Sequence, residues 1–357
     1  MQFGPVEKPV IDQLIRPHFK RFQPYRSARS ETQTAKVFLD ANELSLGSPV
    51  SVEGVDLNRY PDPSQAKLRE AFARRLAVSP DRIFCGVGSD EIIDLLIRLF
   101  CEPGQDEVLI LEPTYGVYRV QCDVNAVQVS SVELDSTFQI DMKKTLDAVT
   151  SETKMIFCCS PNNPTGNLLQ VSDIVELASQ LKGIVAVDEA YVDFAQSPHR
   201  LISIVERYEN IIVLRTLSKA WGLAGIRLGY CIAHPEIVSY LLRIKAPYSI
   251  NTVTSMLALA ALRKEEFFNA SVATVQRERA HMVDALRNIP RVQTIYPSDA
   301  NFLLVEFADA GIAFNALGKQ GIIVRKRSER RLRNCLRITI GTPEENGFLL
   351  RTLGRMA

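Results

Sequence analysis

Along most of this chain, short apolar segments alternate with amphipathic helical segments, and this alternation restricts the possible folds more than any other feature. From about residue 64 onward we predict helices at 65–76, 91–100, 141–149 and 171–181. The apolar segments predict strands at 83–85, 108–111, 127–129, 155–159, 183–187 and 210–214. Strands that are apolar on both faces are typical of a mostly parallel sheet covered by helices on both sides. The pattern therefore predicts an α/β fold whose ligands bind at the carboxyl ends of the strands.

The last third of the chain predicts a second, smaller unit. A helix-rich stretch at about 252–288 is followed by strands at 301–307, 322–324 and 336–340 and by helices at about 310–320 and 344–356. We expect a large domain at 47–251, a small α+β domain at 252–357, and an N-terminal arm at 1–46 that joins the small domain.

Composition and charge exclude several classes of function. A net charge of +1 over 357 residues gives no overall attraction to nucleic acid or membranes. The sequence contains no apolar run long enough to span a membrane and no signal-peptide pattern at its start. Seven cysteines without framework spacing are typical of a reducing compartment, so we expect a cytoplasmic protein. Four scattered histidines offer no metal-ligand spacing, so no metal site is expected.

Polar residues follow two of the predicted strands at their carboxyl ends. Lys219 lies among small residues in the run 216–225, just after the strand 210–214. At such a place desolvation favours the neutral, nucleophilic amine, although a lysine at a strand end is more commonly a surface charge. Asp188 ends the strand at 183–187, and Tyr191 lies three residues beyond it.

Two loops complete the set of strand-end elements. The turn-forming run 160–166 presents Asn163 after the strand 155–159. The glycine-containing loop 86–91 carries Ser89 and Asp90 and opens a helix, so backbone N–H groups and the helix dipole face an anion. Either loop alone could be a simple turn. Together with Lys219 and Asp188, they indicate one site at one edge of the sheet.

These elements, in this order, resemble the fold type I aminotransferases that depend on pyridoxal phosphate, and the match covers nearly the whole chain. The family fold has a mostly parallel seven-stranded sheet in its large domain. More specific segments narrow the resemblance to the histidinol-phosphate aminotransferases: 24–29, 40–43, 57–63, 112–118 and 335–342. One departure is visible at 44–49, where the family often has a proline-bearing turn, and it affects the expected shape of the pocket lip.

The resemblance implies catalytic and cofactor-binding roles. Lys219 would hold pyridoxal phosphate as a Schiff base and shuttle the substrate proton. Asp188 would keep the pyridine nitrogen protonated, so that the ring acts as an electron sink. Tyr191 and Asn163 would bond the phenolic oxygen. The remaining cofactor contacts would be a ring stack from Tyr115 and phosphate contacts from Ser89, Asp90, Ser218, Arg227 and, from the neighbouring subunit of a homodimer, Tyr60.

The resemblance also implies a substrate site. An enzyme of this family would transfer an amino group between histidinol phosphate and 2-oxoglutarate, giving glutamate, in histidine biosynthesis. Arg325 and Arg337 would take the substrate's phosphate or glutamate's carboxylate. The other substrate contacts would come from Tyr25, Asn42, Tyr115 and Asn163.

Three alternatives stay open at this point. The same scaffold serves aromatic-amino-acid aminotransferases and phosphothreonine-type decarboxylases, which would share Lys219 and Asp188. A non-catalytic cofactor-binding regulator is a further class, but such proteins carry an added DNA-binding domain. The basic run at 326–333 resembles a nucleic-acid patch, and we interpret it instead as a solvated hairpin loop.

Overall fold

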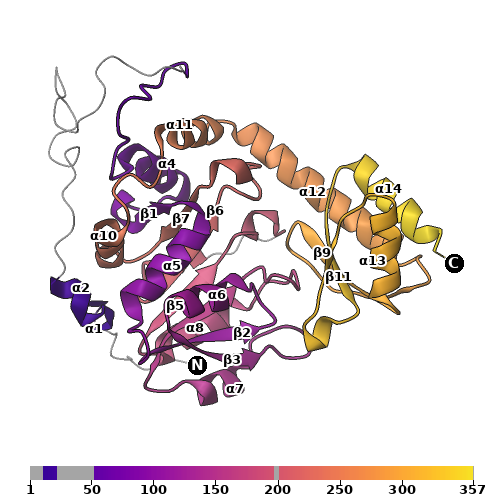
Figure 1. Ribbon diagram of the computed structural model, residues 1–357, viewed down its shortest axis with the longest axis horizontal. Helices are drawn as coiled ribbons and strands as arrows, with labels where there is room; N and C mark the ends of the chain where they lie inside the picture. Colours follow the sequence, from indigo (N-terminus) through magenta and orange to yellow (C-terminus); the bar gives the residue numbers. More distant parts are fainter. Residues whose placement is uncertain (1–10, 22–51, 197–200, 357) are drawn as a thin grey trace.

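The computed structural model describes residues 11–21, 52–196 and 201–356, which form a large unit and a smaller one (Figure 1). The large unit is built on a seven-stranded sheet, which confirms the predicted fold class. Its strands are β1 (Ile83–Gly86), β2 (Glu107–Glu112), β3 (Gln128–Glu133), β4 (Thr153–Cys159), β5 (Ile184–Asp188), β6 (Ile211–Thr216) and β7 (Gly229–Ile232). Their order across the sheet is β1-β7-β6-β5-β4-β2-β3.

Only β7 runs against the direction of the other strands in this sheet. It pairs antiparallel with both β1 and β6, whereas β2 through β6 pair in parallel. The carboxyl ends of β1, β4, β5 and β6 therefore meet at one edge of the sheet. The amino end of β7 reaches the same edge, because Gly229 lies opposite Gly86 and Thr216.

Helices cover both faces of this sheet: α4 (Ala66–Leu76), α5 (Gly88–Phe100), α6 (Val117–Val124), α7 (Met142–Ala148), α8 (Val171–Gln180), α9 (Leu201–Val205), α10 (Pro235–Ile244) and α11 (Thr252–Ala261). Alternate residues of β5 enter different clusters of buried side chains. Val185 and Val187 pack with α4 and α8, whereas Ile184 and Ala186 pack with α5 and α10. This two-residue period is why every position of the strand is apolar.

The described part of the N-terminal arm corrects one of our expectations. We expected residues 1–46 to join the small domain, but α1 (Ile11–Leu14) and α2 (Pro17–Arg21) lie on the large unit. Ile11 and Ile15 are 1% exposed among side chains of the large unit's core. The Arg16 backbone N–H donates to the Leu99 carbonyl over 3.1 Å. The apolar side chains of Ile11 and Ile15 therefore pack next to α10 rather than in the small unit.

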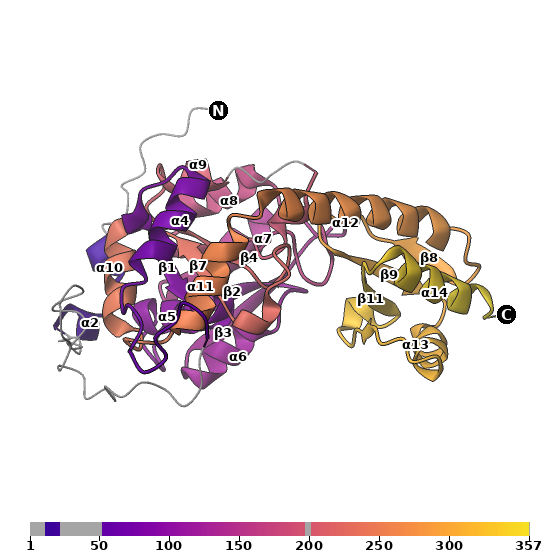
Figure 2. The same ribbon diagram turned by 90° about the horizontal axis from the view of Figure 1, so that it is seen from above.

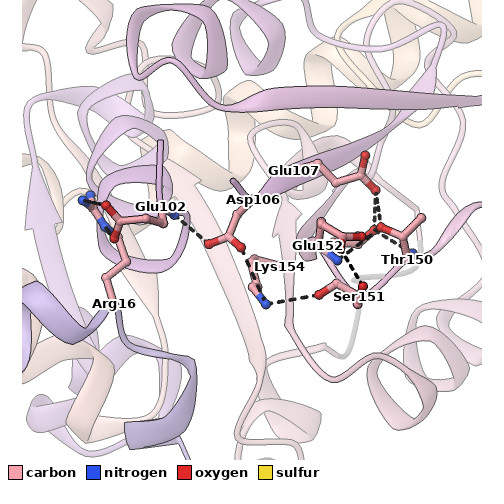
Figure 3. A network of polar contacts seen from close by, with 9 residues as sticks. Arg16, Glu102, Asp106, Glu107, Thr150, Ser151, Glu152 and Lys154 are labelled. Atoms are coloured by element: carbon pink, nitrogen blue, oxygen red, sulfur yellow. Dashed lines mark hydrogen bonds and ion pairs between the residues drawn. The ribbon is translucent and has the colours of Figure 1, made fainter. Parts of the chain in front are cut away.

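An ion-pair network strengthens this attachment at the end of the sheet opposite the strand ends described above. The Arg16 guanidinium donates to both carboxylate oxygens of Glu102, at 2.9 and 3.0 Å. The Glu102 N–H donates to Asp106, whose other oxygen lies 3.7 Å from Lys154 Nζ (Figure 3). The network therefore connects α1 and α2 to the starts of β2 and β4.

The smaller unit contains a four-stranded antiparallel sheet in the order β10-β11-β9-β8. Its strands are β8 (Val292–Ile295), β9 (Phe302–Phe307), β10 (Arg325–Lys326) and β11 (Cys335–Thr339), and its helices are α12 (Glu265–Leu286), α13 (Ala310–Lys319) and α14 (Pro343–Gly354). Helix α12 extends from the large unit to the small one (Figure 2). Because α11 packs on α4, the segment 252–261 lies with the large unit rather than with the small domain that we expected to begin at 252.

Two details of the small unit differ from the sequence prediction. We expected a strand at 322–324, but the paired residues are Arg325 and Lys326. Strand β8 was not predicted, because half of its side chains are exposed and polar.

The basic run at 326–333 forms the expected hairpin loop between β10 and β11, with Lys326, Arg330 and Arg333 exposed, but Arg331 and Leu332 are not solvated as we expected. The Arg331 guanidinium donates to the carbonyls of Leu134 at 2.5 Å and Asp135 at 2.7 Å, and its carbon lies 4.8 Å from the centre of the Phe138 ring. The neighbouring Leu332 is fully buried. The run therefore joins the small unit to the large one, because two carbonyls after β3 match the planar donors of the Arg331 guanidinium.

No helix within residues 11–21, 52–196 and 201–356 is long and apolar enough to cross a membrane. In the same ranges, no three His, Cys, Asp or Glu side chains gather as a metal site. All seven cysteines, Cys158 and Cys159 among them, are buried and unpaired.

Candidate active site

A pocket of about 130 Å³ opens at the edge where the carboxyl ends of the parallel strands meet. The last residues of β4, β5 and β6 all line it. Its lining is Ser89, Asp90, Tyr115, Cys159, Asn163, Asp188, Ala190, Tyr191, Thr216, Ser218, Lys219 and Arg227. Nine of the sequence-predicted site residues thus gather in one place, although they are spread over 139 positions of the chain, from Ser89 to Arg227.

Lys219 follows β6 and projects into this pocket, with its Nζ 5.4 Å from the centre of the Tyr191 ring. Part of its side chain remains accessible to solvent in the single chain. Nevertheless, partial desolvation lowers the pKa of the Lys219 ammonium, and the nearby guanidinium of Arg337 lowers it further. The carboxylates of Asp188 and Asp90 oppose this shift. A lowered pKa leaves more of the amine neutral and able to attack a carbonyl.

Asp188 ends β5 and is 2% exposed. Burial raises the pKa of its carboxyl to about 6, although a hydrogen bond from Tyr118 and one from the Ala190 N–H lower it. The Tyr118 hydroxyl donates to Asp188 Oδ2 over 2.9 Å, and the Ala190 N–H donates to Oδ1 over 3.1 Å. This arrangement prepares a buried carboxylate to face a cationic group.

The opposite end of the pocket is formed by the start of α5. Gly88 has a φ of 73°, which lets the chain turn from β1 into the helix. A Cβ on Gly229 would lie 2.4 Å from the Ser89 backbone nitrogen, so β7 approaches the helix start as closely as glycine allows. The Arg227 guanidinium lies 3.4 Å from Asp90. A helix N-terminus with an arginine beside it is a suitable site for a phosphate.

Asn163 and Tyr191 form a third group with Arg337, which comes from β11 of the small unit. Asn163 Nδ2 donates to the Tyr191 hydroxyl at 3.5 Å, and Arg337 Nη1 donates to Asn163 Oδ1 at 2.5 Å. The guanidinium also lies over the Phe302 ring, 5.4 Å from its centre. Burial raises the pKa of the Tyr191 hydroxyl, which the charge of Arg337 opposes. The small unit thus contributes a cation beside the pocket.

Arg325 occupies a different environment from Arg337. The two lie directly opposite each other in the β10–β11 pair, so their side chains share one face of the small sheet. Arg325 is exposed, whereas Arg337 is half-buried, and neither lines the pocket itself.

The other predicted residues have separate outcomes. Tyr60 is 51% exposed and stacks on Tyr248, with ring centres 4.5 Å apart, rather than lining this chain's own pocket. The Tyr115 hydroxyl donates to Asp90 over 3.2 Å, which fixes its ring at the pocket wall. Tyr25 and Asn42 lie outside the described residues.

Tyr118 was missed by sequence reasoning as a site residue. It is completely buried and does not line the pocket, but it contacts Asp188 from behind. The only feature of the sequence that could have identified Tyr118 is its place three residues after Tyr115. This spacing puts both side chains on one side of a helical turn.

The groups in the pocket fit pyridoxal phosphate. An amine suits the carbonyl carbon, a buried carboxylate suits a cationic ring nitrogen, and the start of α5 with Arg227 suits the phosphate. Asn163 and Tyr191 offer donors for the phenolic oxygen. Lys219, Asp188 and the start of α5 lie at the ends of three different strands, β6, β5 and β1, as a ligand lying across the edge of the sheet requires.

Comparisons with known proteins agree with this geometry. Residues 23–353 match the family described as aminotransferase class I and II. The chain is 46% identical to the histidinol-phosphate aminotransferase of Parabacteroides distasonis, over 97% of this chain and 99% of that protein. It is 44% identical to that of Cytophaga hutchinsonii, over 96% and 98%.

A crystal structure gives the same result at lower sequence identity. The histidinol-phosphate aminotransferase of Sinorhizobium meliloti, in complex with pyridoxal-5'-phosphate, aligns with a TM-score of 0.78 and 26% identity, over 84% of this chain and 82% of that one. The fold, the pocket and the match over nearly the full length lead to one conclusion: this chain belongs to the class I and II aminotransferases.

Proposed function

We propose that this protein is a histidinol-phosphate aminotransferase, which transfers the amino group of L-histidinol phosphate to 2-oxoglutarate in histidine biosynthesis. The products are imidazole-acetol phosphate and L-glutamate. Support comes from relatives of this name at 41–46% identity over nearly the full length. The structural observation that carries the proposal is the contact of Arg337 with Asn163 at the pocket, because it brings a cation for an anionic substrate next to the reactive amine.

Pyridoxal phosphate supplies the electron sink for this reaction when it is bound. Lys219 Nζ would hold the cofactor covalently, and its amine would move the proton at the substrate carbon. The Asp188 carboxylate holds the ring nitrogen in its protonated form. Asn163 and Tyr191 orient the ring through its phenolic oxygen.

The phosphate of the cofactor would be held by the N–H groups at the start of α5, by Ser218 and by Arg227. We propose that Tyr60 reaches the corresponding phosphate of a neighbouring subunit in a cytoplasmic homodimer. Its stack on Tyr248 supports this proposal, because Tyr60 is exposed and neither ring lines the chain's own pocket.

Substrate choice can be tested by removing single arginine charges. In Arg337→Ala, kcat/KM for histidinol phosphate should fall at least about thirtyfold, because truncating one partner of a desolvated charged contact costs about 2–5 kcal/mol. Histidinol, which lacks the phosphate, should already be poor and change little. Arg325→Ala should have a smaller effect, since Arg325 is exposed. Arg337→Ala should also weaken glutamate in the reverse half reaction.

Arg333→Ala is the matched control, because this exposed arginine lies in the same hairpin and loses the same charge. Its three kcat/KM values should stay near those of the wild type. Equal losses for histidinol and histidinol phosphate in Arg337→Ala would show that Arg337 does not recognise the phosphate. That result would favour an aromatic-amino-acid aminotransferase.

A further inference from the structure

Tyr118 is fixed behind the pocket by contacts on several sides. It is completely buried on α6, and its ring stacks on Phe157 with centres 4.5 Å apart and planes 5° apart. The edge of the Tyr115 ring meets it at 5.6 Å. These contacts fix the position of the hydroxyl oxygen, which lies 2.9 Å from Asp188 Oδ2 and also beside the Cys159 thiol. A tyrosine with this packing holds its hydrogen bond without a further loss of side-chain freedom.

The two oxygens of the Asp188 carboxylate accept from different elements. Oδ2 accepts from Tyr118 on α6, and Oδ1 accepts from the Ala190 N–H after β5. One donor on each oxygen fixes the plane of the carboxylate and stabilises its negative charge. Tyr118 is the only side chain of the described residues that donates to this carboxylate, so it has a role that the backbone alone does not fill.

We propose that Tyr118 is a positioning residue, which keeps Asp188 ionised and oriented toward the cationic ring nitrogen of the cofactor. The inference rests on the role that the proposed function gives to Asp188. It adds a residue that touches neither cofactor nor substrate and acts only through this carboxylate.

The electrostatics of the site support this inference. Burial raises the pKa of Asp188 to about 6, and the Tyr118 hydrogen bond is the strongest of the influences that lower it. Without this bond the pKa would rise toward neutral pH, and the carboxyl would carry its proton in part of the molecules at pH 7. The other titratable groups that face Asp188 are Cys159 at the end of β4, Asp90 on α5, Tyr115 before α6, Tyr191 after β5 and Lys219 after β6.

The test measures cofactor binding rather than activity. Cofactor-free Tyr118→Phe retains the ring and its stack on Phe157 but loses the hydroxyl. Its affinity for pyridoxal phosphate at pH 7 should fall about tenfold, since a hydrogen bond to a charged group is lost. Its affinity for the 1-deaza analogue, which has carbon in place of the ring nitrogen, should be unchanged. The pH at which pyridoxal phosphate binding strengthens should also move upward.

Two further variants make the result specific. In an Asp188→Asn background, Tyr118→Phe should have no further effect on discrimination between the two ligands. Tyr230→Phe is the matched control: this buried tyrosine stacks on Phe72 at 4.0 Å and does not line the pocket, so both affinities should be retained.

Unchanged affinities in Tyr118→Phe, or equal losses for both ligands, would overturn the inference. If the variant folds only together with Asp188→Asn, the hydroxyl is required by the buried charge, which supports the inference. If it folds in neither background, its role is structural and the inference fails. No substrate is used, so these outcomes are independent of whether histidinol phosphate is the substrate.

Discussion

Replacing Asp188 with asparagine is expected to stabilise the cofactor-free protein at neutral pH. Burial raises the pKa of this carboxyl from 3.8 to about 6 in the folded protein. Between these pH values the folded carboxyl keeps its proton, whereas the unfolded one has released it. The contribution of Asp188 to stability is therefore fully present below about pH 4 and is lost as the pH rises through about 6. Asparagine does not ionise, so the Asp188→Asn variant does not lose this stability as the pH rises.

The size of this effect follows from the two pKa values. The difference between 3.8 and about 6 corresponds to about 3 kcal/mol of unfolding free energy. Solvent screening reduces this little, because Asp188 is 2% exposed. About half of the loss falls above pH 5. An asparagine can keep both neighbours: its oxygen accepts from the Ala190 N–H, and its nitrogen donates to the Tyr118 oxygen.

Urea unfolding of the cofactor-free wild type and Asp188→Asn should be compared from pH 5 to pH 8 at one protein concentration. The free-energy difference should shift by about 1–2 kcal/mol in favour of the variant over this range. Asp147→Asn, an exposed aspartate on α7, is the control and should give a constant difference. A constant difference for Asp188→Asn as well would refute the reasoning. Half-reaction rates should meanwhile fall more than about a hundredfold in Asp188→Asn, because the ring nitrogen loses its anion.

Three further predictions concern the site and the contact between the units. Borohydride reduction of the protein with bound cofactor should attach the pyridoxyl group to Lys219, and peptide mapping that finds it on another lysine would contradict the assignment. Mixing inactive Lys219→Ala with an inactive Tyr60→Ala variant should restore part of the activity, because one site of a hybrid dimer combines Lys219 and Arg227 of one subunit with Tyr60 of the other; a fully active monomer would exclude a shared site. Arg331→Ala should lower the unfolding free energy by about 1–3 kcal/mol, because two carbonyls lose a charged donor. Arg333→Ala is the control, and both variants are measured by urea unfolding. Equal unfolding free energies for the two variants would show that the Arg331 contact does not stabilise the protein.

Much of the fold and of the pocket could be predicted because the information is local. Each strand of the large sheet is a short apolar run, and the residues that follow the strands lie at its carboxyl edge wherever the strands are parallel. Asp188 and Lys219 are therefore found from the sequence without knowledge of which strands are neighbours. Gly88 and Ser89 are found in the same way, because a glycine-containing turn opens the next helix.

Other parts of the site depend on contacts between residues that are distant in the sequence. Tyr118 lies 70 positions from Asp188, and nothing in its own segment shows which carboxylate it meets. Arg337 lies 174 positions from Asn163. Such pairs depend on the order of strands in the sheet and on the docking of the small unit, which local patterns do not encode.

The same distinction explains two of the differences between the expected and the observed placement of segments. Ile11 and Ile15 are buried next to α10, and nothing in their own segment shows which part of the chain they pack against. The charges of the run 326–333 predict exposure, yet Arg331 finds two carbonyls on the large unit, 197 and 196 positions away. The sequence by itself determined the elements and the chemistry at the strand ends, because periodicity and residue type act within a few residues. Tertiary structure alone decided which faces and charges meet, because packing selects partners by shape and by unpaired donors and acceptors.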